Sequence, residues 1–177
     1  TPRLARSLLV SAIRDPDPVI FLEPTRAYRS PREEVPEDVE TYPLGMARVV
    51  QEGDDLTLVS WGAMLHTSLQ AVEQAQEEHG FHIEVIDLLT LSPADMATVI
   101  TSVQKTGRAV VVHEAPRTLG FGAEIGARIN EEALLSLEAP IRRVTGYDVP
   151  VPLYARESAY LPTEARILQA IEETIHF

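Results

Sequence analysis

The neighbouring residues His113 and Glu114 have the chemical types required for acid–base catalysis. Histidine titrates near neutral pH, and a nearby carboxylate would raise its pKa. The pair follows the short apolar run 108–112, at the carboxyl end of a predicted buried strand, where ligands gather in open α/β sheets. Successive strand residues point to opposite faces, which argues against a mutual hydrogen bond. Since the sequence shows no second catalytic cluster, we favour a structural or interface role over a catalytic one.

Gly120, Gly122 and Gly126 follow this strand and invite comparison with a dinucleotide-binding turn. Their spacing is G-x-G-x-x-x-G, which differs from the G-x-G-x-x-G fingerprint. They also follow the third strand of the predicted domain, and no acidic residue stands at a suitable place about 20 residues further on. We therefore favour a tight turn with close helix packing, with cofactor binding as the weaker alternative.

A candidate cation site lies in segment 12–17, where the first predicted helix ends. The last turn of a helix has unpaired carbonyl oxygens and carries the negative end of the dipole. Asp15 and Asp17 add carboxylate oxygens to a turn held by two prolines, and an all-oxygen site suits a hard cation. From the residues alone, a helix end with solvated aspartates is the interpretation we favour.

Other classes of site lose their main support. The five histidines lack the H-x-x-x-H and H-E-x-x-H spacings of zinc sites, and the absence of cysteine excludes disulfides and thiolate metal sites. Neither a G-x-S-x-G elbow nor a phosphate-binding G-x-x-x-x-G-K-[ST] loop occurs.

The composition is that of an ordinary globular chain with an acidic surface. Of the 177 residues, 45% are hydrophobic and 24% are charged, and the net charge is −12. This charge disfavours nucleic-acid binding and fits a basic protein partner better. No apolar run approaches the roughly 20 residues that span a bilayer, so we expect no membrane partner. Without a visible signal peptide, a cytoplasmic setting is the default expectation.

The elements that must position these residues follow from hydrophobic periodicity. Short apolar runs predict strands at 19–22, 56–61, 83–87, 108–112 and 141–144. Helical spacing predicts one helix that ends at Asp15, and further helices over 63–79, from Ser92 as N-cap to 105, from 121 onward, and from Thr163 as N-cap. Alternating strands and helices predict an open α/β sheet wrapped by helices.

Segment 25–43 has a different composition, which predicts a linker between two domains. Acidic residues are frequent in it, and prolines lie in and around it, at Pro18, Pro24, Pro31, Pro36 and Pro43.

One family resemblance runs along the whole chain, carried by AIRDPDPVIFLEPTRAYR, EEVPEDVETYPLG, QEGDDLTLVSWG, IEVIDLLTL, SVQKTGRAVVVHEAP, GFGAEI and LEAPIRRVTGYDVPVP. These segments resemble the C-terminal half of the β-subunit of the thiamine-dependent 2-oxoacid dehydrogenase (decarboxylating) component. Within the family, QEGDDLTLVSW, KTGR with HEAP, and LEAP with GYD look most like the branched-chain (2-oxoisovalerate) member. The pyruvate member is the alternative, and a non-catalytic acidic protein-binding module is the alternative outside the family.

The resemblance implies an α2β2 heterotetramer that uses thiamine diphosphate and Mg²⁺. Residues 1–42 would be the end of a pyrimidine-binding domain plus linker. Residues 43–177 would be a transketolase C-terminal-like domain, with an open, mostly parallel sheet and helices on both faces. The family's catalytic glutamate and active-site histidine would precede Thr1, so this chain alone is expected to be inactive. The expected location is the bacterial cytoplasm or, as the second choice, the mitochondrial matrix.

Two family sites match positions of this chain. A K⁺ ion would be held by backbone and side-chain oxygens of Ala12, Ile13, Asp15 and Asp17. The subunit-binding domain of the dihydrolipoyl acyltransferase would place basic residues against Glu138, against Glu131 or Glu132, and against the terminal carboxylate of Phe177. Other implied partners are the α-subunit and a second β-subunit. The acidic net charge agrees with a basic partner, because opposite charges steer association.

Overall fold

The sheet of this protein has five strands in the order β1-β3-β2-β4-β5. The structure, a computed structural model, describes residues 1–29 and 32–177. The strands are β1 (Arg48–Gln51), β2 (Leu56–Ser60), β3 (Ile83–Asp87), β4 (Ala109–Pro116) and β5 (Arg142–Gly146). Four of them run parallel, and β1 joins β3 antiparallel at one edge. The prediction of an open, mostly parallel sheet is confirmed.

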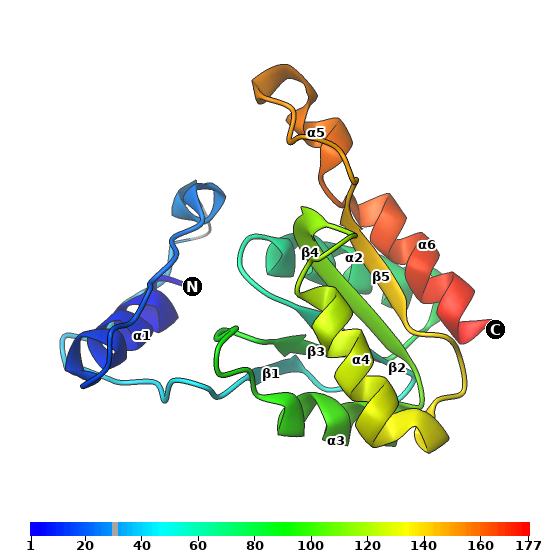
Figure 1. The fold of residues 1–177 in the computed structure, drawn as a ribbon, viewed down its shortest axis with the longest axis horizontal. Helices are drawn as coiled ribbons and strands as arrows, with labels where there is room; N and C mark the ends of the chain where they lie inside the picture. Colours follow the sequence, from blue (N-terminus) through cyan, green and yellow to red (C-terminus); the bar gives the residue numbers. More distant parts are fainter. Residues whose placement is uncertain (30–31) are drawn as a thin grey trace.

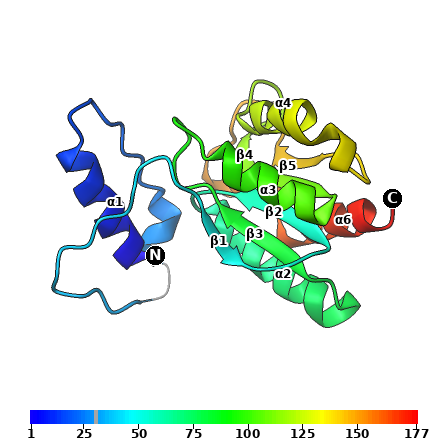
Figure 2. The same cartoon turned by 90° about the horizontal axis from the view of Figure 1, so that it is seen from below.

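Helices cover both faces of this sheet, as Figures 1 and 2 show. The helices α2 (Met64–His79) and α6 (Glu164–Ile175) pack together on one face, and α3 (Met96–Thr106) and α4 (Gly122–Ala133) pack together on the other. Each face has its own apolar core. In β4, Val110 and Val112 face the first core while Val111 faces the second, which explains the continuous apolar run in the sequence.

The ends of several helices follow simple capping rules. Gly80 and Gly107 end α2 and α3 in the left-handed conformation, with φ of 72° and 69°. Thr163 caps α6 as predicted, because its hydroxyl accepts a hydrogen bond from Arg166 N at 3.3 Å. The prediction of Ser92 as the N-cap of α3 is wrong. Asp95 is the cap, since its carboxylate accepts from the amide of Thr98 at 3.1 Å and from the Thr98 hydroxyl at 2.7 Å.

Two strand predictions also differ from the structure. Segment 19–22 is not a strand, and Ile20 and Leu22 are 87% and 77% exposed. Among the described residues no neighbouring strand pairs with this segment, and without backbone pairing and a covering layer an apolar run does not form a strand. Conversely, β1 was not predicted, because Arg48 to Gln51 lacks a clear alternation of apolar and polar residues.

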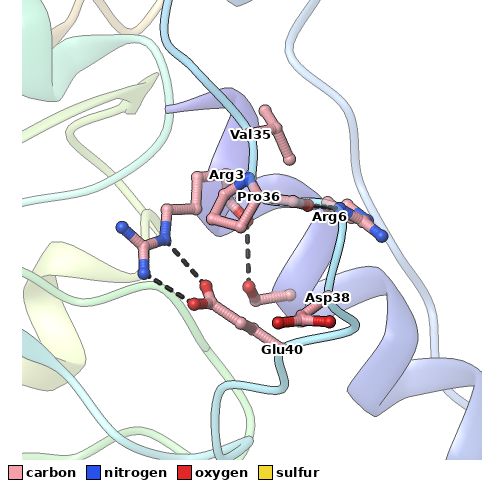
Figure 3. A pocket seen from close by; sticks show the side chains of 7 residues that line it. Arg3, Arg6, Val35, Pro36, Asp38 and Glu40 are labelled. Atoms are coloured by element: carbon pink, nitrogen blue, oxygen red, sulfur yellow. Dashed lines mark hydrogen bonds and ion pairs between the residues drawn. The ribbon is translucent and has the colours of Figure 1, made fainter.

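The N-terminal helix α1 (Pro2–Arg14) packs against the segment that follows it. Arg3 forms a two-pronged pair with Glu40, at 2.7 and 2.6 Å, which Figure 3 shows beside Pro36 and Asp38. The Ser11 hydroxyl donates to Tyr42 O at 2.6 Å. The shallow hollow in Figure 3 is lined by both members of this ion pair and by Arg6, Val35, Pro36 and Asp38. This part of the chain is held mainly by polar contacts.

The predicted linker has little regular structure where it is described. A short 3-10 turn, η1 (Thr25–Arg29), is its one helical element in the described part, and the predicted linker residue Pro31 lies outside the described residues. The apolar side chains of α1 are incompletely covered, with Ile13 74% exposed. In the described part of the chain, no helix has the length and apolar character needed to cross a membrane.

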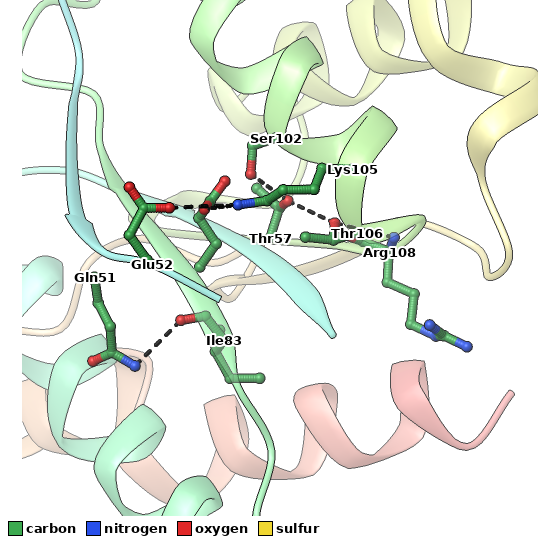
Figure 4. A network of polar contacts seen from close by, with 9 residues as sticks. Gln51, Glu52, Thr57, Ile83, Ser102, Lys105, Thr106 and Arg108 are labelled. Atoms are coloured by element: carbon green, nitrogen blue, oxygen red, sulfur yellow. Dashed lines mark hydrogen bonds and ion pairs between the residues drawn. The ribbon is translucent and has the colours of Figure 1, made fainter. Parts of the chain in front are cut away.

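A buried polar network lies at the amino end of the sheet (Figure 4). The Thr57 hydroxyl contacts those of Ser102 and Thr106 at 2.6 and 2.8 Å, which joins β2 to α3. Beside them, the ammonium of Lys105 pairs with the buried carboxylate of Glu84. Burial alone would raise the pKa of Glu84, but hydrogen bonds, first from Lys105 and then from Ser102, hold it below its usual value.

Candidate functional site

The strand order places a topological switch point between β2 and β4. From β2 the chain crosses to β3 on one side, and from β3 it crosses back over β2 to β4. In open α/β sheets the carboxyl ends of the strands at such a point form a ligand-binding crevice. Here the residues at that point are Trp61, directly after β2, and His113, near the end of β4. The candidate predicted from sequence therefore lies where the fold would place chemistry.

The switch point is filled by packed rings. His113 is 1% exposed and stacks on Trp61, with ring centroids 5.3 Å apart and planes inclined by 15°. Phe121 meets the same indole edge-on at 5.9 Å. A Cβ atom on Gly120 would lie 2.6 Å from His113 Cε1, and one on Gly122 would lie 2.4 Å from His113 Nε2. The glycines thus permit close packing against the imidazole, in keeping with the preferred interpretation of the G-x-G-x-x-x-G segment.

The imidazole of His113 is neutral at physiological pH. Burial lowers its pKa from 6.5 to about 4, and the charge of Arg143 adds to this effect, against a small opposing contribution from the backbone of Ala115. Neither ring nitrogen has a hydrogen-bond partner in the described chain. Glu114 is exposed and lies 3.9 Å from the guanidinium of Arg26. His113 and Glu114 therefore do not form an acid–base pair. This favours a structural role for His113 over a catalytic one.

A second polar group at this edge was missed from the sequence. Asp87 ends β3, is 4% exposed, and lies 3.8 Å from the guanidinium of Arg48. Burial raises its pKa to about 6, which Arg48 and the amide of Leu89 partly oppose. Ser60 pairs in register with Asp87, and its buried hydroxyl has no partner among the described residues. The sequence did contain a signal for Asp87, because a charged residue ends a strand that was predicted to be buried.

Ser60 and Asp87 end β2 and β3, and His113 lies in the neighbouring strand β4, yet the three residues form no catalytic triad. Residues alternate between the two faces along a strand. Ser60 and Asp87 are two residues after Leu58 and Val85, so they share the face of the sheet that carries the α2/α6 core. His113 is two residues after Val111, so it shares the opposite face, which carries the α3/α4 core. The sheet itself therefore separates the serine and aspartate from the histidine.

The loop between β4 and α4 is fastened to the segment after β5. The amide and hydroxyl of Thr118 both donate to the carboxylate of Asp148 at 2.8 Å. These two bonds hold the pKa of Asp148 below its usual value. Beyond this point the chain projects past the sheet through η3 (Tyr154–Arg156) and α5 (Glu157–Tyr160), as Figure 1 shows.

The residues predicted to bind an acyltransferase lie at the opposite, amino end of the sheet. Glu131 and Glu132 are in the last turn of α4, Glu138 precedes β5, and Phe177 follows α6, which runs back from the carboxyl end. Glu132 pairs with Arg128 and Glu138 with Arg108, each at 2.8 Å, while the Phe177 residue is 75% exposed. The four residues share one end of the domain but flank it from both faces, and their role stays a prediction.

The residues predicted to hold K⁺ lie on one turn at the end of α1. Ala12 and Ile13 are in its last turn, and Asp15 is its C-cap. One carboxylate oxygen of Asp15 accepts from the amide of Asp17 at 2.9 Å, so that oxygen is already engaged. In the described part of the chain, no group of three or more acidic, histidine or cysteine side chains is arranged to bind a metal. A site here would combine backbone carbonyls with the remaining carboxylate oxygens of Asp15 and Asp17, and it stays a prediction.

Known proteins resemble this chain along its whole length. It is 50% identical over 175 residues to the mitochondrial 2-oxoisovalerate dehydrogenase subunit beta of Dictyostelium discoideum, which covers 99% of this chain and 47% of that protein. It is 48% identical over 177 residues to the pyruvate dehydrogenase E1 component subunit beta of Bacillus subtilis, covering 100% and 54%. The chain thus spans about half the length of these relatives.

Solved structures agree on the fold. A structure described as a split gene transketolase, an inactive β4 tetramer, matches with a TM-score of 0.69 and 25% identity over 82% of this chain and 46% of that one. The family model for the transketolase C-terminal domain matches residues 45–167, all of them within the predicted second domain. The chain therefore belongs to the family of transketolase C-terminal domains.

Proposed function

We propose that this chain is the C-terminal half of the β-subunit of a 2-oxoacid dehydrogenase (decarboxylating) component. The observation that carries the proposal is the collinear identity of about half of all positions with β-subunits of two such enzymes. The full enzyme would use thiamine diphosphate and Mg²⁺ and would transfer an acyl group to lipoyl. It would work in the bacterial cytoplasm or the mitochondrial matrix.

Within that enzyme, this half would serve assembly and docking. At its switch point, Trp61 and His113 stack on each other, which supports a packing role for these residues. No residue of this chain is proposed to bind the cofactor or to catalyse the reaction. Residues 1–42 would complete a pyrimidine-binding domain, and residues 43–177 would contact the α-subunit and a second β-subunit.

The substrate we propose is a branched-chain 2-oxoacid, with pyruvate as the alternative. Identities of 50% and 52% to two 2-oxoisovalerate enzymes stand against 48% to a pyruvate enzyme, a small difference. The test is to purify the full-length β-subunit with its α-subunit and to measure kcat/KM for 2-oxoisovalerate and pyruvate with an artificial electron acceptor. A higher value for pyruvate would overturn the branched-chain assignment. No decarboxylation of either acid would overturn the enzyme class.

Docking of the acyltransferase is proposed at Glu131, Glu132, Glu138 and the Phe177 carboxylate. Calorimetric titration of the assembled component with the subunit-binding domain should show affinity that falls with salt, because charge pairs are screened. Glu138→Lys should weaken binding about tenfold or more. Glu73→Lys reverses an exposed charge in the middle of α2 and is the matched control. Equal affinity for both variants and the wild type would refute docking at Glu138.

Binding of K⁺ is proposed at Ala12, Ile13, Asp15 and Asp17. Two carbonyls and two carboxylates supply only oxygen ligands, which suits this hard cation. The melting temperature of the full-length β-subunit should be higher in KCl than in NaCl at equal ionic strength. The difference should disappear in Asp15→Ala. Equal melting temperatures in both salts would exclude K⁺ binding there.

A further inference from the structure

The carboxyl end of the sheet carries an exposed patch in which two arginines lie beside apolar side chains. We call it the arginine patch and define it as Arg117, Leu119, Arg143, Tyr147 and Val149. The Thr118–Asp148 hydrogen bonds join its two segments. Leu119 is 97% exposed, Val149 53% and Tyr147 49%. An exposed apolar cluster of this kind, with arginine and tyrosine in it, is typical of a protein–protein contact.

The two arginines are held in place without an ionic partner. Arg143 Nη1 donates to the carbonyl of Arg117 at 3.1 Å, and Arg117 Nη1 approaches the carbonyl of Arg143 at 3.5 Å. Neither guanidinium forms an ion pair with a carboxylate of the described chain, although Asp148 lies close enough for Arg117 to lower its pKa. Each guanidinium keeps donors for a further acceptor, and its planar fork matches a carboxylate.

The backbone holds Leu119 in an unusual conformation that presents it to solvent. Its φ is 61°, in the left-handed region that a bulky side chain rarely adopts. The neighbouring Thr118–Asp148 bonds fix the loop on one side, and the packing of Gly120 against His113 fixes it on the other. Strain of this kind persists only where the surroundings impose it, and such positions cluster at binding sites.

Charge and symmetry indicate which partner fits. Two neighbouring arginines without an ionic partner would attract an acidic surface, although the chain as a whole has a net charge of −12. Most homodimer contacts are isologous, with the same patch on both sides. An isologous contact here would press two arginine patches together and would be repulsive. A different polypeptide is therefore favoured over a second copy of this chain, and the apolar rim favours a protein segment over a free anion.

We infer that the arginine patch binds an acidic segment of the α-subunit, with a carboxylate between Arg117 and Arg143 and apolar side chains on Leu119 and Tyr147. The inference rests on the proposed function, which supplies the α-subunit as a partner. It goes further by assigning that contact to one end of this domain, away from the residues proposed for acyltransferase docking.

Photo-crosslinking tests the inference in the assembled enzyme. A photoreactive amino acid replaces Leu119 of the full-length β-subunit, and another preparation carries it at Leu135 in η2 (Leu134–Ser136), which is equally exposed but lies at the amino end of the sheet. Position 119 should cross-link to the α-subunit, and position 135 should not. A product with a second β-subunit, no product, or equal yields from both positions would overturn the inference.

Charge reversal gives an independent measurement. The double variant Arg117→Glu with Arg143→Glu should weaken α–β association about tenfold or more, while Arg117→Lys with Arg143→Lys should lose less because the charge remains. Arg128→Glu, at a partly exposed position of α4, is the control and should leave association unchanged. Unaltered association of a folded double-Glu variant, or equal loss in the control, would contradict the inference. Failure of the wild-type subunits to associate would instead refute the proposed function, and the inference with it.

Discussion

Trp61 and His113 stack face to face at the switch point of the sheet, 5.3 Å between centroids, and this contact closes the place where open α/β sheets usually bind ligands. The imidazole is among the largest fully buried side chains of the chain, and its nitrogens have no hydrogen-bond partner among the described residues. It therefore behaves as a planar packing element whose neutrality is a condition of the fold.

Stability should depend on pH through His113. Its pKa is about 4 in the folded state, against an ordinary value of 6.5, so the unfolded state binds more protons between these values. This contribution is complete above pH 6.5 and is lost as pH falls toward 4, about 2 kcal/mol by pH 5. In urea unfolding at pH 7.5 and 5.0, His113→Gln should lose less stability between the two pH values than the wild type. Equal losses would contradict this.

The contribution of Asp87 to stability should change with pH in the opposite direction to that of His113. The folded-state pKa of Asp87 is about 6, above the ordinary 3.8, so the folded state binds more protons in that interval. Its contribution is favourable below pH 3.8 and is lost as pH rises through 6. Asp87→Asn should therefore stabilise the protein at pH 8 by about 1–2 kcal/mol, after allowance for the weakened contact with Arg48, and the gain should vanish at pH 4. A gain that did not change with pH would point to a cause other than the charge.

Removing the partner of Glu84 should be costly. The carboxylate is buried, and Lys105→Met would leave it without its ammonium, at a cost of about 2–3 kcal/mol in urea unfolding. The double variant Lys105→Met with Glu84→Gln should recover most of this loss. Arg128→Met breaks an exposed pair with Glu132 and should cost at most about 0.5 kcal/mol. A double variant as unstable as the single one would argue against the buried charge as the cause.

Two glycines of the same segment should respond oppositely to alanine. On Gly120, a Cβ would lie 2.3 Å from the carbonyl oxygen of Pro116, so Gly120→Ala should destabilise the protein by about 2–3 kcal/mol. On Gly126, inside α4, a Cβ would meet nothing within 4 Å. Gly126→Ala should stabilise the protein by about 0.5–1 kcal/mol, because alanine favours a helix. Thermal melts of both variants test this. Similar changes in melting temperature would show that the close approach of Pro116 O to Gly120 does not exclude a Cβ atom.

Sequence periodicity was sufficient for the core of the fold and for the position of His113. Apolar runs bounded by glycine or proline predict β2 to β5 because a strand buried on both faces has no polar alternation. The same rule failed at 19–22, where an apolar run has nothing in the described chain to pair with. It also missed β1, whose short mixed run Arg48–Gln51 is defined only by pairing with β3.

The chemical environment of each candidate residue was harder to predict. The type of His113 suggested proton transfer, but only its packing against Trp61 and two glycines shows that it is neutral and enclosed. The arginine patch depends on contacts between segments about 26 residues apart, and nothing in local spacing brings Arg117 to Arg143. Predicting which charged residues pair across strands requires the register of the strands, which a single sequence does not specify.

The shifted register of β1 also bears on how copies of this domain avoid aggregation. Between Val49 and Gln51 the pairing with β3 is irregular, so the outer edge of β1 does not offer a regular row of amide and carbonyl groups. A foreign strand needs such a row to extend a sheet. We therefore expect the domain to resist strand exchange and fibril growth along this edge, so that association is left to side-chain surfaces.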